Sequence, residues 1–244
     1  GRARNLGNMN TATREDLLFP LLSDVALFDA FSGEQLRFLA AECFARQACK
    51  GAVIFEKGAV LGGFFAVREG RVKLAVLAPD GGERVVQIAL AGDSIGESLG
   101  LVDRPSPVYA QALCSSSLLF FRAERVRAAA LRWPSLGALL LEQACIRVNE
   151  LYRDLEASCL QTARQRVAGY LLRSLTCGAQ SSHRLAESAV LPAGKAVVAS
   201  RLNLTPETFS RELRHLTDEG VISVERCTVQ VHQLERLRAA ASGD

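Results

Sequence analysis

Hydrophobic and polar residues follow two different periods along the chain, and the first lies between about residues 43 and 121. Apolar residues there recur at every second position in short runs, which glycine-containing turns separate. Such runs cover residues 52–55, 64–67, 72–77, 84–90 and 110–121, with a tight turn at residues 79–82. Many short strands at regular spacing predict an antiparallel sandwich or roll.

Helical periodicity precedes this region. Ser32 is a favourable N-cap for a helix over residues 33–43, in which Leu36, Leu39 and Ala40 share one face. A shorter apolar turn is expected over residues 25–31. The strand region is therefore expected to begin only after about residue 43.

A long helix is predicted to begin near Pro134 and to run to about Cys159. A helix of roughly two dozen residues is about 36 Å long, more than one roll covers. Its apolar stripe therefore favours pairing with a second copy of the chain, although packing on the roll itself is the alternative. The stripe consists of Leu136, Leu140, Ile146, Leu151 and Leu155. On the other faces, Glu150 and Asp154 are expected to pair with Arg147 and Arg153.

The last third of the chain predicts a helix over residues 162–176, a loop over 177–188, and then two short helices. The first short helix spans about residues 193–202. A sharp turn follows at residues 202–204, and Thr205 and Pro206 suit the N-cap and first position of the second helix. This second helix buries Phe209, Leu213 and Leu216 and ends at Gly220, before strands at 221–224 and 228–231. Together these elements predict a helix-turn-helix with a wing.

The second helix presents its polar face at the end where a recognition helix contacts base edges. Arg211 can bind guanine through two hydrogen bonds, Glu207 can accept from cytosine N4, and Ser210 can add a weaker contact. Glu207 and Arg211 lie four residues apart, so a surface ion pair is the alternative interpretation. Both interpretations can hold, because the pair can orient the arginine for its base. The candidate DNA-binding residues are Arg201, Thr205, Glu207, Thr208, Ser210, Arg211 and Arg214.

Composition agrees with a globular protein. Of 244 residues, 49% are hydrophobic and 23% are charged, which excludes a disordered chain. No apolar run is long enough for a membrane span, and residues 1–13 contain no secretory signal, so a cytoplasmic location is expected. The seven cysteines include no C-x-x-C pair and are expected to be free thiols. The net charge of +3 lies in residues 161–244, which permits an anionic partner there.

The chain contains no P-loop, G-x-S-x-G, H-E-x-x-H or metal-spaced cysteine and histidine motif. Asp93 and Glu97 are a carboxylate pair, but both lie in a glycine-containing turn. These observations argue against an enzyme and against a resident metal site. A protein-interaction module that binds no DNA is a further alternative.

The order of roll, long helix and winged helix-turn-helix resembles the CRP/FNR transcription regulators across nearly the whole chain. Residues 93–98 and 69–72 are similar to conserved turns of that family's roll, and residues 206–211 are similar to the FNR-type recognition helix. The resemblance implies an α+β fold with a cyclic-nucleotide-binding-like antiparallel β-roll, a dimerisation helix and a winged helix-turn-helix. The expected domains are residues 1–133, 134–160 and 161–244.

The resemblance also implies a homodimer that binds a TTGAT-type palindrome in double-stranded DNA and contacts RNA polymerase. An effector pocket is expected to include Gly96, Glu97, Tyr109, Leu151 and Tyr152. Cyclic AMP is disfavoured, because the family's arginine and hydroxyl pair for its phosphate is missing near Ser106 and Pro107. Leu151 and Tyr152 also stand where adenine-contacting hydroxyl groups would lie.

An FNR-type iron–sulfur cluster is excluded, because residues 1–42 contain no cysteine. Residues 191–224 resemble the nitric oxide regulators of the DNR type, which implies haem between roll and long helix. All three histidines, His183, His215 and His232, lie in the C-terminal part, so haem needs another ligand. Candidates are Cys43, Cys49, Cys114, Tyr109 and Met9. Effector-independent control and a cysteine redox switch are the alternatives.

Overall fold

The computed structural model describes residues 22, 31–78, 81–177 and 188–243. The chain forms two compact units, one of residues 1–77 and 86–147 and the other of residues 78–85 and 148–244. The predicted turn over residues 25–31 and the predicted loop over 177–188 fall almost wholly outside the described residues. Among the described residues, no helix combines the length and apolar character needed to cross a bilayer.

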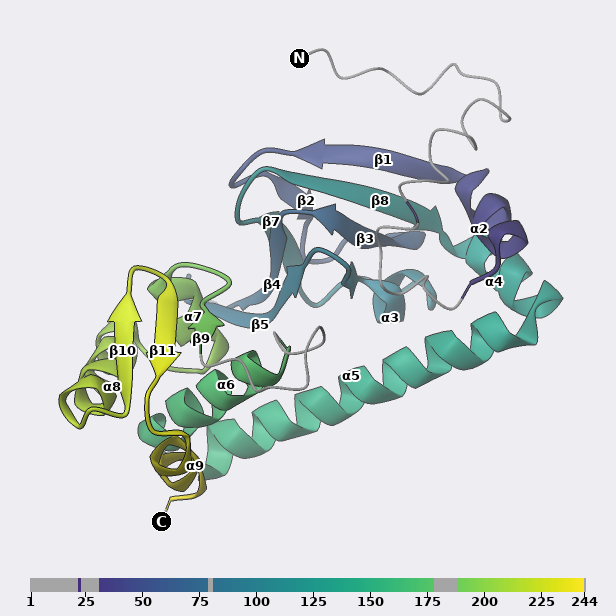
Figure 1. The fold of residues 1–244 in the computed structure, drawn as a ribbon. Helices are drawn as coiled ribbons and strands as arrows, with labels where there is room; N and C mark the ends of the chain where they lie inside the picture. Colours follow the sequence, from purple (N-terminus) through teal and green to yellow (C-terminus); the bar gives the residue numbers. More distant parts are fainter. Residues whose placement is uncertain (1–21, 23–30, 79–80, 178–187, 244) are drawn as a thin grey trace. The chain divides into compact units, whose positions relative to one another are not determined.

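Two four-stranded sheets form the roll of the first unit (Figure 1). The order of one sheet is β1 (Cys43–Ala48), β8 (Ser116–Arg122), β3 (Gly63–Glu69) and β6 (Ser94–Ile95). The other has the order β2 (Val53–Phe55), β7 (Tyr109–Ala112), β4 (Arg71–Leu77) and β5 (Glu83–Leu90). All pairs of the first sheet are antiparallel, as are β2–β7 and β4–β7. The predicted antiparallel roll is therefore confirmed.

The alternation along β3 shows how the roll builds its core. Phe64 and Ala66 belong to one buried cluster, whereas Phe65 and Val67 belong to another. Side chains of a strand point alternately to opposite faces, so β3 contributes to a core on each side of its sheet. Phe64 stacks on Phe121 with ring centroids 5.3 Å apart.

Three helices accompany the roll: α2 (Gly33–Ala40), α3 (Glu97–Gly100) and α4 (Ala123–Arg132). Ser32 caps α2 in a capping box, because Gln35 N–H donates to its hydroxyl and its own N–H donates to the Gln35 side chain. The predicted extension of α2 to residue 43 is wrong. Cys43 instead begins β1, where it pairs with Phe121 of β8.

The predicted long helix is α5 (Pro134–Leu160). Leu136 is buried in the roll's core and Leu140 packs against it, so this end of the stripe is intramolecular. Beyond it, the large apolar side chains of α5 are at least 45% exposed: Leu141, Ile146, Val148, Leu151, Tyr152, Leu155 and Leu160. The first part of the stripe therefore packs on the roll, as the alternative interpretation holds. The exposed remainder is free to pair with a second copy of the chain.

The second unit contains α6 (Ala163–Cys177), α7 (Lys195–Arg201), α8 (Pro206–Asp218) and α9 (Leu234–Ser242). Its sheet has the order β10 (Ile222–Glu225), β11 (Thr228–Val231) and β9 (Ser188–Val190). The α7–α8 pair and the β10–β11 hairpin confirm the predicted winged helix-turn-helix. Val167, Leu171 and Leu175 of α6 are buried as predicted, whereas Leu172 is only half-buried.

Candidate nucleic-acid interface

Local sequence fixes where α8 begins. The Thr205 hydroxyl accepts a hydrogen bond from the Thr208 N–H at 3.2 Å, and Pro206 occupies the first turn, as predicted. Asn203 in the preceding turn has a φ of 55°, a left-handed conformation that asparagine tolerates better than most residues. The turn is therefore sharp enough to place α8 directly after α7.

Arg166 of α6 forms hydrogen bonds to this turn, although it lies outside the α7–α8 pair. Its Nη1 donates to the carbonyl oxygens of Leu202 and Asn203, at 3.0 Å each. Both carbonyls lie where α7 has ended, so they lack partners within a helix. A charged donor satisfies them and links the turn to α6.

The buried side of α8 leaves a polar side exposed. Phe209, Leu213 and Leu216 are at most 3% exposed. Thr205, Glu207, Ser210, Arg211 and Arg214 are exposed, and Thr208 is half-buried. The structure therefore places six of the seven predicted DNA-binding residues on α8 and its N-cap, five of them exposed.

The alternative interpretation, an ion pair between Glu207 and Arg211, is not what the structure shows. The Glu207 carboxylate accepts hydrogen bonds from its own N–H and from the Thr205 hydroxyl, which lower its pKa. Arg211 Nε instead lies 3.6 Å from Glu212 Oε1. Glu207 thus turns back to the start of the helix, while the Arg211 side chain stays 59% exposed.

Sequence reasoning missed Glu212, which is largely buried beneath this face. Its second carboxylate oxygen lies 3.7 Å from His215 Nδ1. The only available signal was its position, because residue 212 lies between Phe209, Leu213 and Leu216 on the apolar side. A buried carboxylate beside Arg211 and His215 can orient both side chains.

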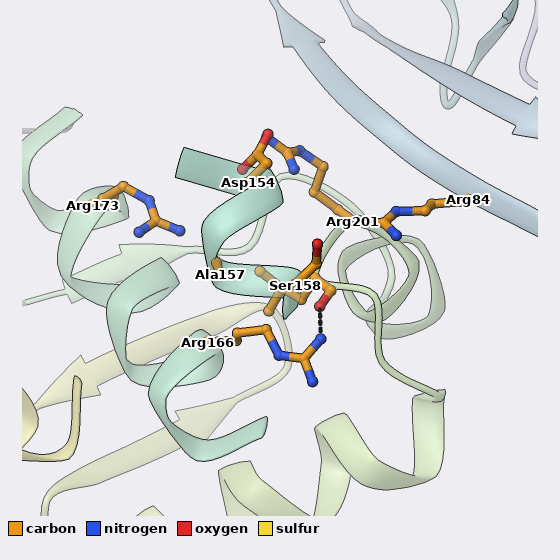
Figure 2. A pocket seen from close by; sticks show the side chains of 8 residues that line it. Arg84, Asp154, Ala157, Ser158, Arg166, Arg173 and Arg201 are labelled. Carbon is orange, nitrogen blue, oxygen red and sulfur yellow. Dashed lines mark hydrogen bonds and ion pairs between the residues drawn. The ribbon is translucent and has the colours of Figure 1, made fainter. Parts of the chain in front are cut away.

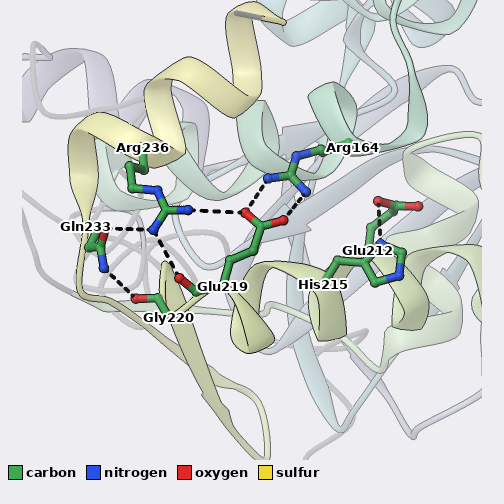
Figure 3. A network of polar contacts seen from close by, with 7 residues as sticks. All are labelled: Arg164, Glu212, His215, Glu219, Gly220, Gln233 and Arg236. Carbon is green, nitrogen blue, oxygen red and sulfur yellow. Dashed lines mark hydrogen bonds and ion pairs between the residues drawn. The ribbon is translucent and has the colours of Figure 1, made fainter.

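A second polar network holds the C-terminal end of α8 (Figure 3). Arg164 Nη1 and Nη2 donate to the two carboxylate oxygens of Glu219 at 2.7 and 2.6 Å, which lowers the pKa of Glu219 and raises that of Arg164. Arg236 donates to the Glu219 carbonyl oxygen at 3.1 Å, and Gln233 donates to the Gly220 carbonyl oxygen at 3.3 Å. Both ends of α8 are therefore tied to neighbouring helices.

Arg201, the seventh predicted residue, lies apart from the other six. Its Nη2 donates to the Asp154 carboxylate at 2.6 Å, and both side chains are at most 25% exposed. This contact also corrects the expected pairing of Asp154 with arginines of its own helix. The two residues are 47 positions apart, so only the tertiary structure could show the pair.

The predicted effector-pocket residues are divided between the two units. Gly96 precedes α3, Glu97 begins it, and Tyr109 is buried on β7 with Lys73 Nζ 5.6 Å from its ring centroid. Burial raises the pKa of Glu97, against the Ser94 hydrogen bond that lowers it. Leu151 and Tyr152 are exposed on α5 in the second unit. Their union in one pocket stays a prediction.

Near Ser106 and Pro107, the sequence lacks the arginine and hydroxyl pair that would bind the phosphate of a cyclic nucleotide. The Ser106 hydroxyl at this position is buried. Ser106 Oγ donates to the Val108 carbonyl oxygen at 2.6 Å and accepts from the Val108 N–H at 3.2 Å. This hydroxyl is therefore satisfied within its own turn.

The candidate haem ligands lie in dissimilar places. Cys43 is buried in the packed core, Cys49 is exposed and Cys114 is half-buried. Met9 and His183 lie outside the described residues. His232 Nε2 lies 2.9 Å from the Ser223 hydroxyl on the wing. Within residues 31–78, 81–177 and 188–243, no group of three or more histidine, cysteine, aspartate or glutamate residues could hold a metal ion.

Comparisons with known proteins support this arrangement. A cyclic nucleotide-binding domain model matches residues 45–132, and a Crp-like helix-turn-helix domain model matches residues 165–240. A probable transcriptional activator of Rhizobium leguminosarum bv. viciae is 27% identical over 86% of this chain and 88% of its own. The transcriptional activator protein anr of Pseudomonas aeruginosa is 27% identical over 80% of this chain and 79% of its own. FixK2 of Bradyrhizobium japonicum shares the fold, with a TM-score of 0.72 and 21% identity over 81% of this chain and 96% of that one.

Proposed function

The chain belongs to the CRP/FNR family of transcription regulators, and we propose that it binds double-stranded DNA as a homodimer through α8. The exposed face of α8 is the observation that carries this proposal. Glu207, Ser210 and Arg211 lie near its N-terminal end, which recognition helices insert into the major groove. The buried opposite face and the two anchored ends keep this surface in one orientation.

The proposed target is a TTGAT-type palindrome. Arg211 would donate to the O6 and N7 of a guanine, and Glu207 would accept from a cytosine N4. The lowered pKa of Glu207 keeps its carboxylate ionised at neutral pH, as an acceptor requires. The family resemblance adds contact with RNA polymerase at the promoter. A catalytic role is not part of the proposal.

The exposed apolar residues of α5 support the homodimer. Val148, Leu151 and Leu155 follow the three- and four-residue spacing that places side chains on one helix face. A pair of such helices, one from each copy, would cover this face. The two copies of α8 would then contact half-sites about 34 Å apart, one helical turn of DNA.

Fluorescence anisotropy with labelled duplexes tests the DNA-binding proposal. One duplex carries two TTGAT half-sites in palindromic order, and the control carries scrambled half-sites of the same composition. We expect binding to the palindrome at least about a thousandfold tighter, and its loss when five base pairs are inserted between the half-sites. Equal affinity for both duplexes at physiological salt would contradict sequence-specific binding.

For the effector, the resemblance to nitric oxide regulators favours haem, but two of the candidate axial ligands are already occupied by other contacts. Cys43 is enclosed by packed core side chains, and the Tyr109 ring faces the Lys73 ammonium group. Haem therefore rests on the resemblance alone, and effector-independent or cysteine redox control are the alternatives. An anaerobic haemin titration decides between them: a saturable Soret band near one haem per chain that shifts with nitric oxide supports haem. A non-saturating rise in absorbance would exclude haem.

A further inference from the structure

Four arginines converge on one pocket in the second unit (Figure 2). The pocket is small and partly open to solvent. Arg84 comes from β5, Arg166 and Arg173 from α6, and Arg201 from the end of α7. The remaining lining residues are Asp154, Ala157, Ser158 and Leu202.

Four arginines and one carboxylate are among the residues that line this pocket. Asp154 is the single carboxylate among the lining residues, and it already binds Arg201 at 2.6 Å. Like charges held close together repel, and the repulsion is strongest where water is excluded. Burial, and then Arg84, lower the pKa of Arg166. Burial also lowers the pKa of Arg173, where Asp154 and Tyr170 raise it and Arg201 and Arg153 lower it further.

One donor in the pocket also lacks an acceptor. Arg166 Nη1 is used by the Leu202 and Asn203 carbonyl oxygens, but its Nε is shielded from solvent and has no hydrogen-bond partner among the described residues. A buried donor without a partner is costly, and each instance calls for an explanation. The Ser158 hydroxyl donates its proton to the Leu155 carbonyl oxygen at 2.9 Å, so the arginines are the donors that an anion in this pocket would use.

We propose that this pocket binds the phosphate group of a small molecule, or inorganic phosphate. Guanidinium groups bind phosphate oxygens through paired, charge-assisted hydrogen bonds, and four of them line this site. The lining contains no aromatic side chain on which a nucleobase could stack. It is therefore suited to a phosphate group and not to a whole nucleotide.

The position of the pocket separates this site from the DNA-binding face. None of its lining residues belongs to α8 or to the β10–β11 hairpin. An anion bound here would join Arg84 to the arginines of α6 and α7 and would relieve the repulsion among them. The proposal does not depend on DNA recognition by α8, so either can fail alone.

Isothermal titration of inorganic phosphate into the full chain tests the proposal, in chloride buffer at constant ionic strength. We expect one saturable site per chain. Arg84→Gln and Arg173→Gln should each weaken phosphate binding about tenfold, because each removes a charged donor. Arg238→Gln is the matched control: this exposed arginine on α9 pairs with Glu235, outside the pocket, and its loss should leave the affinity unchanged.

Asp154→Asn should change phosphate affinity in the direction opposite to the arginine variants. Removal of the competing carboxylate should tighten phosphate binding several-fold, whereas a purely structural cluster would lose stability without any gain in affinity. Absence of saturable binding, or equal affinity in wild type, Arg84→Gln and Arg173→Gln, would overturn the proposal. Circular dichroism of each variant shows that it is folded.

DNA titrations in phosphate-free buffer identify the source of the phosphate. We expect Arg84→Gln and Arg173→Gln to leave DNA affinity unchanged and phosphate not to displace DNA. A parallel loss of DNA affinity in both variants, with Arg238→Gln unaffected, would assign the pocket to a DNA backbone phosphate and overturn the small-molecule proposal.

Discussion

Arg164 and Glu219 form a bidentate pair that joins the beginning of α6 to the end of α8, with N–O distances of 2.7 and 2.6 Å. Planar guanidinium and carboxylate groups match in this geometry, which gives it more strength than a single contact. Because Arg236 also reaches Glu219, three segments of the winged unit meet at one carboxylate.

This pair predicts a pH-dependent loss of stability in Glu219→Gln. Arg164 lowers the folded-state pKa of Glu219 below its ordinary value of 4.5, so the folded state releases this proton more readily than the unfolded state. The stabilisation is therefore present above that ordinary value and is lost as pH falls through the lower folded-state pKa. Both side chains are about one-third exposed, so solvent screening limits the expected loss to about 1 kcal/mol at pH 7. Urea unfolding of both proteins from pH 7 to 3 measures it, and a pH-independent difference would contradict the assignment.

The cap of α8 predicts the effect of Thr205→Ala. The substitution leaves the Thr208 N–H without its side-chain acceptor and should cost about 1 kcal/mol of unfolding free energy. Thr205→Ser keeps the hydroxyl and should recover most of the loss. Chemical denaturation of the three proteins provides the measurement. A serine variant as unstable as the alanine variant would mean that the methyl group, and not the cap, matters.

Base recognition by Arg211 predicts a change in specificity as well as in affinity. Arg211→Ala should weaken palindrome binding by about 1–3 kcal/mol and remove the preference at one base pair of each half-site. Arg238→Ala removes an exposed positive charge from α9 and should have little effect. Anisotropy with a set of single-base variants of the duplex separates the two. If Arg211→Ala lowered the affinity equally for every duplex variant, Arg211 would contact a DNA phosphate and not a base.

The exposed part of α5 predicts a monomeric variant. The Leu155 side chain is 60% exposed in the isolated chain and lies on the face proposed to meet the second copy. A buried leucine contributes about 1.5–3 kcal/mol, and two-fold symmetry counts each substitution twice. Leu155→Glu should therefore weaken dimerisation at least about a hundredfold in size-exclusion chromatography with light scattering. Glu156→Ala, on the neighbouring position, should remain dimeric.

Two glycines of the roll predict different costs for an added methyl group. A Cβ at Gly70 would clash with Ser116 Oγ and lie 2.7 Å from the Ser115 carbonyl oxygen, whereas a Cβ at Gly81 would meet none of the described residues within 4 Å. Both have a φ near 90°. Gly81→Ala should cost about 1–2 kcal/mol from backbone strain alone, and Gly70→Ala clearly more. Thermal unfolding of the two variants compares them, and equal losses would contradict the clash.

Local signals accounted for much of this fold. The alternation around Phe64–Phe65, the cap at Ser32 and the Thr205–Pro206 start of α8 each depend on neighbouring residues, and each was predictable. The helices α4 and α9 were missed because alanines supply much of their apolar face, and small side chains give a weak periodic signal.

Contacts between distant residues limited what could be predicted of the site. The side chains along α8 could be placed on its exposed face from their spacing alone. The Asp154–Arg201 pair joins residues far apart in the chain, and the burial of Glu212 depends on what covers it. No local pattern encodes the Asp154–Arg201 pair, and helical spacing gives only a weak signal for the burial of Glu212. Both change which charged groups are available at the surface.

The hydrogen bonds from Arg166 to the turn carbonyls of Leu202 and Asn203 have a mechanical consequence. A change in the crossing angle of α7 and α8 would strain this charged contact to α6, so we expect α6, α7 and α8 to move together. For a dimer of the proposed kind, a signal could then alter DNA affinity by translating or rotating two such groups of helices relative to each other. Regulation would tune the separation of two unchanging recognition surfaces, and a variant that loosens this turn would bind DNA less selectively in every regulatory state.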